Sequence, residues 1–124
     1  MQRCAPRRRR GAVAGEALSL AAKVGVDLAA VLDIVGGSAA ASWMLNDRGP
    51  RMLEDTPRVT SAVDIFVKDL GSVLEVGREA QAALPLAALA HQMFLSVAGH
   101  GYGKQDDSQV IRAYHALKGD ESAK

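Results

Sequence analysis

One lysine of this sequence, Lys68, lies where its charge could bind or position an anionic ligand. Lys68 lies within residues 61–71, and a step of 100° per residue places the apolar side chains of this segment and its continuation on one helix face. That face holds Val63, Phe66, Val67, Leu70, Val73, Leu74 and Gly77. Lys68 falls nearly opposite, beside Asp64. An ion pair between the two, worth about 0.2–0.5 kcal/mol, is the plainest interpretation. A positioning charge for an anionic ligand is the alternative.

The other candidate sites have simpler explanations than chemistry. Gly99-x-Gly101-x-Gly103 lacks the preceding strand and the G-x-G-x-x-G spacing of a dinucleotide loop, so turns with φ > 0 explain it better. The paired acids Asp106-Asp107 are expected at a helix end, where capping and solvation account for them. The single Cys4 and three scattered histidines give no metal-ligand spacing, so no metal site is expected.

The composition predicts one all-α domain. The chain has 124 residues, of which 48% are hydrophobic and only 4% aromatic, so its core must be built from Ala, Leu and Val. No segment alternates at period two, and about six helices are expected. No apolar run approaches 18 residues, so we expect no membrane contact. The lone cysteine fits a reducing compartment, and the predicted location is the cytoplasm.

The first ten residues differ from the rest in charge. They hold five arginines and no acid, so without these five the net charge of +1 becomes +1 − 5 = −4. A nucleic-acid-binding arm and a transit peptide are two interpretations. A truncated or misread start is the third and the one we favour, because no nucleic-acid-binding motif follows. Residues 1–14 are expected to be disordered, since consecutive arginines repel one another.

Capping signals predict the remaining boundaries. A helix from Glu16 ends at Gly25, and Asp27 caps the next. Ser38 is expected to cap a third helix that Gly49-Pro50 breaks. Further signals follow along the chain: Ser61 with Asp64 as a capping box for a helix to about Ala83, Pro85 in the first turn of a helix to about Ala98, and Asp106 with Gln109 as a capping box for the last helix.

Several of these motifs, in this order, resemble the C-terminal domain of the 3-hydroxyisobutyrate dehydrogenase family. They are Glu16-Ala17 before Gly25-Val-Asp27, Pro50 with Met52-Leu53, Lys68-Asp69-Leu70, Pro85, Gly101-x-Gly103 and Asp106-x-Ser108. The amino-acid sequence of residues 61–70 is especially similar to that of the L-threonate dehydrogenase branch. The resemblance implies a helical domain like the C-terminal domain of 6-phosphogluconate dehydrogenases, spanning residues 15–119 with a tail at 120–124.

The resemblance also implies a function. Family members oxidise a small hydroxy acid by hydride transfer to NAD or NADP, which an N-terminal Rossmann domain holds while the helical domain closes over it and mediates oligomerisation. It makes Lys68 a cofactor contact, with Asp69 a weaker candidate, and NAD the expected cofactor, with NADP left open. The polarising lysine and asparagine of the family's joining helix have no counterpart in these 124 residues, so no catalytic residue is assigned and the chain alone is expected to be inactive.

We therefore interpret the chain as the NAD-binding and dimerisation domain of an L-threonate-type dehydrogenase. A non-catalytic oligomerisation module is one alternative, because the helix beginning at Pro85 is apolar almost all round and favours a second copy as partner. A nucleic-acid-binding helical protein that uses the arginine arm is the other. Loss of DNA binding on removal of residues 1–11 would separate this last alternative from the others.

Overall fold

The computed structural model describes residues 4–119, which form six α-helices, a π-helical turn and a 3₁₀ turn. The predicted all-α fold is confirmed. The α-helices are α1 (Cys4–Lys23), α2 (Leu28–Gly36), α3 (Trp43–Met52), α4 (Val63–Glu79), α5 (Pro85–Val97) and α6 (Ile111–Leu117). The π-helical turn η1 (Ala98–Tyr102) follows α5, and the 3₁₀ turn η2 (Asp107–Val110) leads into α6.

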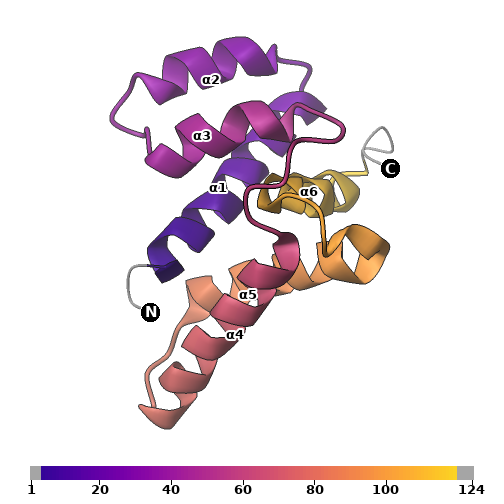
Figure 1. The fold of residues 1–124 in the computed structure, drawn as a ribbon. Coiled ribbons are helices and arrows are strands. Elements are labelled where there is room, and N and C mark those ends of the chain that lie inside the picture. The colour runs from indigo at the N-terminus through magenta and orange to yellow at the C-terminus, as the bar shows by residue number, and fades with distance from the viewer. Residues whose placement is uncertain (1–3, 120–124) are drawn as a thin grey trace.

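Helix α1 forms the centre of the domain. It lies between the α2–α3 pair and the α4–α5 pair, with α6 packed beside it (Figure 1). Small residues allow this close packing, because Gly11 faces the Met44 side chain and Gly15 faces the Tyr114 ring. Leu18, only 1% exposed, continues the same face one turn later. The spacing of these residues is the i, i+4, i+7 repeat of a buried helix face.

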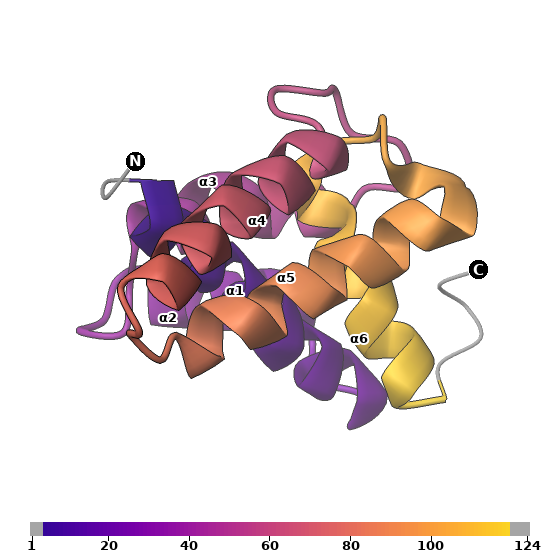
Figure 2. The ribbon, with the colours of Figure 1, turned by 90° about the horizontal axis from the view of Figure 1, so that it is seen from below.

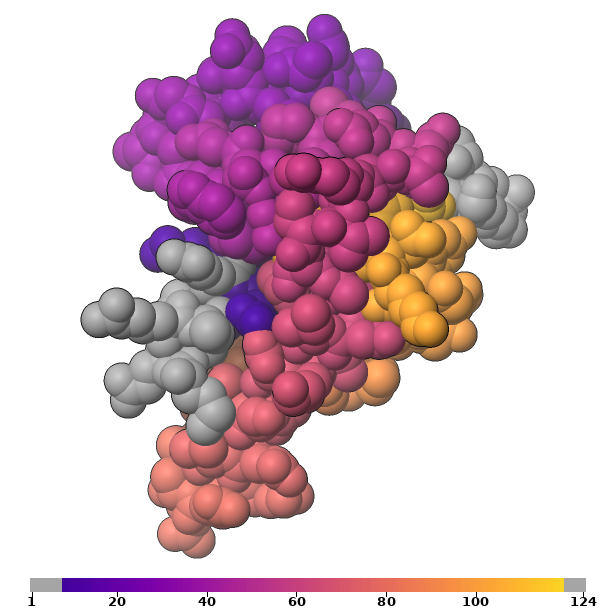
Figure 3. Space-filling model, in the orientation of Figure 1, coloured from indigo at the N-terminus to yellow at the C-terminus, as the bar shows by residue number. Residues whose placement is uncertain are grey.

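Helices α4 and α5 run side by side as an antiparallel pair, seen most clearly from below (Figure 2). The Phe66 and Phe94 rings meet between them, with centroids 4.9 Å apart and planes inclined by 50°. The end of α4 and the start of α5 project from the body of the molecule (Figure 3). Gly77 allows the turn there, since a Cβ at that position would lie 2.5 Å from Leu84 Cδ1.

The predicted disorder of residues 1–14 is wrong for residues 4–14, which form the first half of α1. Arg8 helps to hold the helix at this end, because its side chain is only 11% exposed and packs on α4, and Ala12 and Ala14 are buried in the core. Burial on a neighbouring helix offsets the repulsion on which the prediction relied. Residues 1–3 and the predicted tail at 120–124 lie outside the described residues.

Two other boundary predictions, at the two ends of α3, are wrong. Ser42, not Ser38, caps α3, and its Oγ accepts the Leu45 N–H at 3.0 Å. Gly49 and Pro50 lie inside α3 instead of ending it. A Cβ at Gly49 would lie 2.4 Å from Leu32 Cδ2, so this glycine permits a close approach of α2 to α3 and does not make a turn. The caps at Asp27 and Gly25 are confirmed.

Candidate functional site

Lys68 is held on an exposed face of α4 by the burial of the opposite face. Val63, Phe66 and Leu70 are each no more than 4% exposed, as the apolar periodicity predicts. Lys68 itself is exposed, and its ammonium forms no ion pair within 4.0 Å with any described residue. The expected pair with Asp64 is therefore not formed. A cation on a rigid helix with no carboxylate partner is available to an anionic ligand.

Asp64 contacts the glycine loop and not Lys68. Its carboxylate lies so close to Gly103 that a Cβ there would be 2.4 Å from Asp64 Oδ1. The Asp64 N–H donates to Gly103 O at 2.8 Å, which fixes the loop against the first turn of α4. Gly101, with φ of 97°, turns the chain into this loop, as expected. Gly103 has an ordinary helical φ of −56° and is needed for the close approach alone.

Asp69, the weaker cofactor candidate, is engaged by α1. Its carboxylate forms an ion pair with the Arg8 guanidinium. The same guanidinium lies over the Phe66 ring, 4.3 Å from its centroid. Arg8 thus contacts the residues on both sides of Lys68 in the sequence of α4, although it lies about sixty positions away along the chain.

The start of α4 is satisfied by backbone groups and not by the predicted Ser61–Asp64 capping box. The residue before the helix, Ala62, makes no side-chain cap, and the Val63 N–H donates to Gln105 O at 2.9 Å. Ala62 also forms an isolated antiparallel bridge with Asp106. Carbonyls of a distant loop replace the side-chain cap because this loop is held against the helix by buried acids.

Asp106, fully buried, ties three segments together. One carboxylate oxygen accepts the Thr60 N–H at 2.9 Å and the Thr60 hydroxyl at 3.0 Å, and Arg51 lies 3.4 Å away. The other oxygen accepts the Ser108 hydroxyl at 2.6 Å. Capping by Asp106 is confirmed, but through the Ser108 N–H, while the side-chain Oε1 of Gln109 accepts from Arg112 Nε instead of closing the capping box. Solvation, the other explanation for these paired acids, is wrong.

Asp107 is 2% exposed and forms a bidentate pair with Arg48 of α3. Arg48 Nε donates to Asp107 Oδ1 at 2.7 Å and Nη2 to Oδ2 at 3.1 Å. Arg48 also pairs with the neighbouring Asp47. Paired in this way, two charges remain buried at the junction of α3 and η2 without being stranded.

The pKa values of the two adjacent acids are shifted in opposite directions. Burial acts to raise the pKa of Asp106, but hydrogen bonds from Ser108 and Thr60 outweigh it and hold that pKa below 3.8. For Asp107 burial dominates, and its pKa lies above 3.8 although Arg48 acts to lower it.

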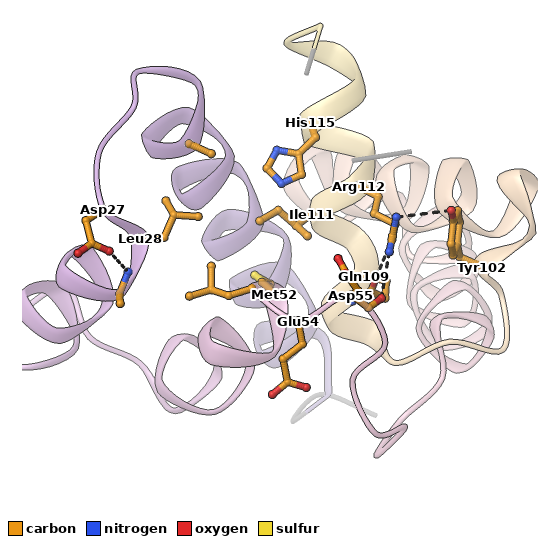
Figure 4. Close-up of a pocket in the computed structure, with 13 residues that line it drawn as sticks. Asp27, Leu28, Met52, Glu54, Asp55, Tyr102, Gln109, Ile111, Arg112 and His115 are labelled. Carbon is orange, nitrogen blue, oxygen red and sulfur yellow. Dashed lines mark hydrogen bonds between the residues drawn. The ribbon is translucent and has the colours of Figure 1, made fainter. Parts of the chain in front are cut away.

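A groove of about 740 Å³ lies on another part of the domain, lined from α1, α2, α3, η1 and α6 (Figure 4). Arg112 is fixed at one end: it donates to Gln109 Oε1 at 2.6 Å and to Asp55 O at 3.1 Å, and stacks 4.5 Å from the Tyr102 ring centroid. None of the residues that line the groove is Lys68, Asp69 or Arg8. The groove is therefore separate from the corner where α4 meets α1.

The described residues contain no group of three His, Cys, Asp or Glu side chains that could hold a metal ion. Within the same range, no helix has both the length and the apolar character needed to cross a membrane.

The sequence analysis did not predict two ion pairs: that of Arg8 with Asp69 and that of Arg48 with Asp107. The signal for Arg8 was present: Arg8, Gly11, Gly15 and Leu18 share one helical face, so the arginine continues a buried stripe. For Arg48 no local signal existed, because its partner Asp107 lies 59 positions further along the chain.

The fold and the outer face of α4 define an all-helical domain with an exposed lysine, Lys68, that has no carboxylate partner among the described residues. A family model described as "NAD-binding of NADP-dependent 3-hydroxyisobutyrate dehydrogenase" matches residues 10–114, most of the chain. The chain belongs to this family, as the ordered motifs predicted. The match begins within the arginine run and so includes part of the segment that the resemblance had excluded.

Curated relatives and a solved structure agree with the family. The L-threonate dehydrogenase of Cupriavidus necator is 45% identical over 107 residues, which cover 86% of this chain and 36% of that protein. The L-threonate dehydrogenase of Escherichia coli K12 is 42% identical over 106 residues, covering 86% and 35%. The crystal structure of 3-hydroxyisobutyrate dehydrogenase from Salmonella typhimurium superposes with a TM-score of 0.82 at 44% identity, covering 87% of this chain and 38% of that one. The chain spans about a third of the length of these curated relatives.

Proposed function

We propose that this chain is the cofactor-capping helical domain of a hydroxy-acid dehydrogenase that oxidises an L-threonate-like substrate with NAD. The family match and the names of the two L-threonate dehydrogenases support this class of reaction. NAD is the proposed cofactor, and NADP stays an alternative because the family description contains both names. The cytoplasmic location stays a prediction of the sequence.

One observation carries the proposal: Lys68 is an exposed cation with no carboxylate partner among the described residues, on a helix face fixed by buried neighbours. Resemblance assigns the lysine of this motif to the nicotinamide cofactor, and an ammonium can fix the position of a ribose or a pyrophosphate by charge. Asp69 stays the weaker candidate, since Arg8 engages its carboxylate.

Alone, Lys68 cannot hold a dinucleotide. One exposed charge pair contributes at most about 1 kcal/mol, whereas micromolar affinity requires about 8 kcal/mol. Hydride transfer also needs the cofactor oriented beside the substrate. We therefore assign Lys68 a role in positioning a cofactor whose main contacts a dinucleotide-binding domain supplies.

The test joins the upstream part of the Cupriavidus necator relative to this chain and measures oxidation of L-threonate. Lys68→Ala should raise the KM for NAD about 5-fold and lower kcat, with unchanged helix content, because the side chain is exposed and contributes little to packing. Arg78→Ala is the matched control: Arg78 is a cation on the same helix, 80% exposed, and lies ten residues or about 15 Å further along. Equal kinetics for the unaltered protein and Lys68→Ala would reduce Lys68 to a surface lysine.

Self-association is a second proposed role, supported by the outer face of α5. Leu86, Leu89 and Leu95 are 65%, 59% and 43% exposed, so α5 keeps apolar side chains outside the core, as its apolar pattern almost all round the helix predicts. Exposed apolar surface of this kind can mark an interface. We expect a homo-oligomer by light scattering at tens of micromolar, and Leu89→Gln should weaken it. A monodisperse monomer would contradict this role.

A further inference from the structure

The acids nearest to Lys68 on α4 are both turned away from it. Asp64, one helical turn earlier, is held against the loop at Gly103. Asp69, the next residue, is paired with Arg8. An i,i+4 acid would normally attract the lysine, so the absence of this contact leaves the positive charge of Lys68 uncompensated within α4. The corner is thus more cationic than the sequence of α4 alone indicates.

Arg8 is well placed to neutralise Asp69 permanently. Its side chain is 11% exposed, and its guanidinium lies over the Phe66 ring at 4.3 Å from the centroid. The ring and the carboxylate hold the guanidinium from two directions, which limits the alternative orientations available to it. The guanidinium therefore stays beside the Asp69 carboxylate and masks its negative charge.

We propose that Arg8 is a positioning residue that acts through Asp69, keeping this carboxylate away from Lys68 so that the corner attracts an anionic group such as the pyrophosphate of a dinucleotide. This inference rests on the proposed function, since it takes Lys68 to be the contact. It gives one arginine of the basic run a defined task inside the domain. It also assigns Asp69 to the support of the site and not to the cofactor.

The expected effect follows from one uncompensated charge. Without Arg8, Asp69 would carry an uncompensated negative charge on the residue next to Lys68. For an assumed separation of about 6–8 Å between this carboxylate and the anion, Coulomb repulsion near a protein surface corresponds to a loss in affinity of about 3- to 10-fold at low salt. Salt should reduce the loss strongly, because the Debye length is only about 3 Å at 1 M.

The experiment uses the 124-residue chain labelled with ¹⁵N and titrated with inorganic pyrophosphate at low salt, observed at the amides of residues 66–72. Four variants are compared with the unaltered chain: Arg8→Met, Arg8→Lys, Asp69→Asn and the double variant Arg8→Met with Asp69→Asn. Arg8→Met should weaken binding about 3- to 10-fold, and Arg8→Lys should restore most of it. The double variant should bind within about twofold of the unaltered chain, because it removes the exposed carboxylate. Thermal melting of each variant records the change in stability separately.

The double variant decides between electrostatic and structural roles. It still lacks the ion pair and the contact with the Phe66 ring, so a purely structural Arg8 predicts binding as weak as in Arg8→Met. That result would overturn the inference, as would unchanged binding in Arg8→Met or the absence of any pyrophosphate shift in the unaltered chain. The fused dehydrogenase with Lys68→Ala tests the proposed function independently. A cofactor effect there, combined with failure here, would remove only the role of Arg8.

Discussion

Breaking the Arg48–Asp107 pair should be the most destabilising single change among the charged residues. The two side chains are 9% and 1% exposed, and their contact is bidentate at 2.7 and 3.1 Å. Removing one partner of such a pair strands the other charge and costs about 3–5 kcal/mol. Arg48→Met should fall at the upper end, because Asp107 keeps only the distant charge of Arg51. Asp107→Asn should cost about 3 kcal/mol, since Arg48 retains Asp47.

The assay is thermal or urea unfolding followed by circular dichroism. An unfolding entropy of about 2.1 cal/mol/K per residue gives about 0.26 kcal/mol/K for 124 residues, so a loss of 4 kcal/mol lowers Tm by about 15 °C. Arg78→Met is the control, because the Arg78–Glu75 pair is exposed and 4.0 Å long, and such pairs contribute about 0–1 kcal/mol.

A double variant completes the reasoning. Arg48→Met with Asp107→Leu removes both charges, so its loss should be smaller than the sum of the two single losses by at least about 2 kcal/mol. Strict additivity of the two changes would refute the claim that stranded charge is the cause. Single losses below about 1 kcal/mol would refute the burial argument itself.

The pH dependence of Arg48→Met gives an independent check. Burial already raises the pKa of Asp107, and removal of Arg48 takes away the interactions that lower it. A folded-state pKa above the unfolded value means that the destabilisation is present above that folded pKa and is relieved as pH falls through it. The Tm of Arg48→Met should therefore approach that of the unaltered chain as the pH is lowered through the raised folded-state pKa of Asp107.

Three further predictions concern other parts of the chain. Gly103→Ala should lower stability by about 1–3 kcal/mol, because a Cβ would lie 2.4 Å from Asp64 Oδ1 and one of them must shift; melting measures this, and no change would show that the loop yields freely. Burial, with the charge of Glu16 second, raises the pKa of Tyr114 to about 12, so stability present below pH 10 should be lost as pH rises toward 12. Alkaline melting of Tyr114→Phe should show a smaller loss. The 124 residues purified alone should not reduce NAD or NADP with L-threonate, and turnover above the blank that survives repurification would contradict the proposed division of roles.

Local patterns predicted the parts of the fold that local forces decide. The apolar stripe of α4 gave its buried face and the exposure of Lys68, because helix periodicity fixes both together. The caps at Asp27 and Gly25 were predictable for the same reason, since each uses neighbours within four residues. The family, too, could be predicted, from motifs whose order and spacing were informative although each alone was weak.

Contacts between distant segments decided what local patterns could not predict. Ser61 and Asp64 have the spacing of a capping box, yet the carbonyls of Gly103 and Gln105 satisfy the start of α4 instead. Gly49 is a helix breaker by type, but its place against Leu32 keeps it inside α3. Composition misled in the arginine run, because a single arginine on a buried stripe outweighs the repulsion among its neighbours.

The acid network links the stability of the domain to the corner that carries Lys68. Arg48 comes from α3 and Asp107 from η2, while the adjacent Asp106 holds the chain before α4 through Thr60. The first turn of α4 therefore depends on charges that lie away from the exposed lysine. Arg48→Met should thus destabilise the domain, whereas Lys68→Ala should alter cofactor kinetics at nearly unchanged Tm. Because the two changes act on different quantities, they separate the part of the chain that maintains the fold from the part that we propose contacts the cofactor.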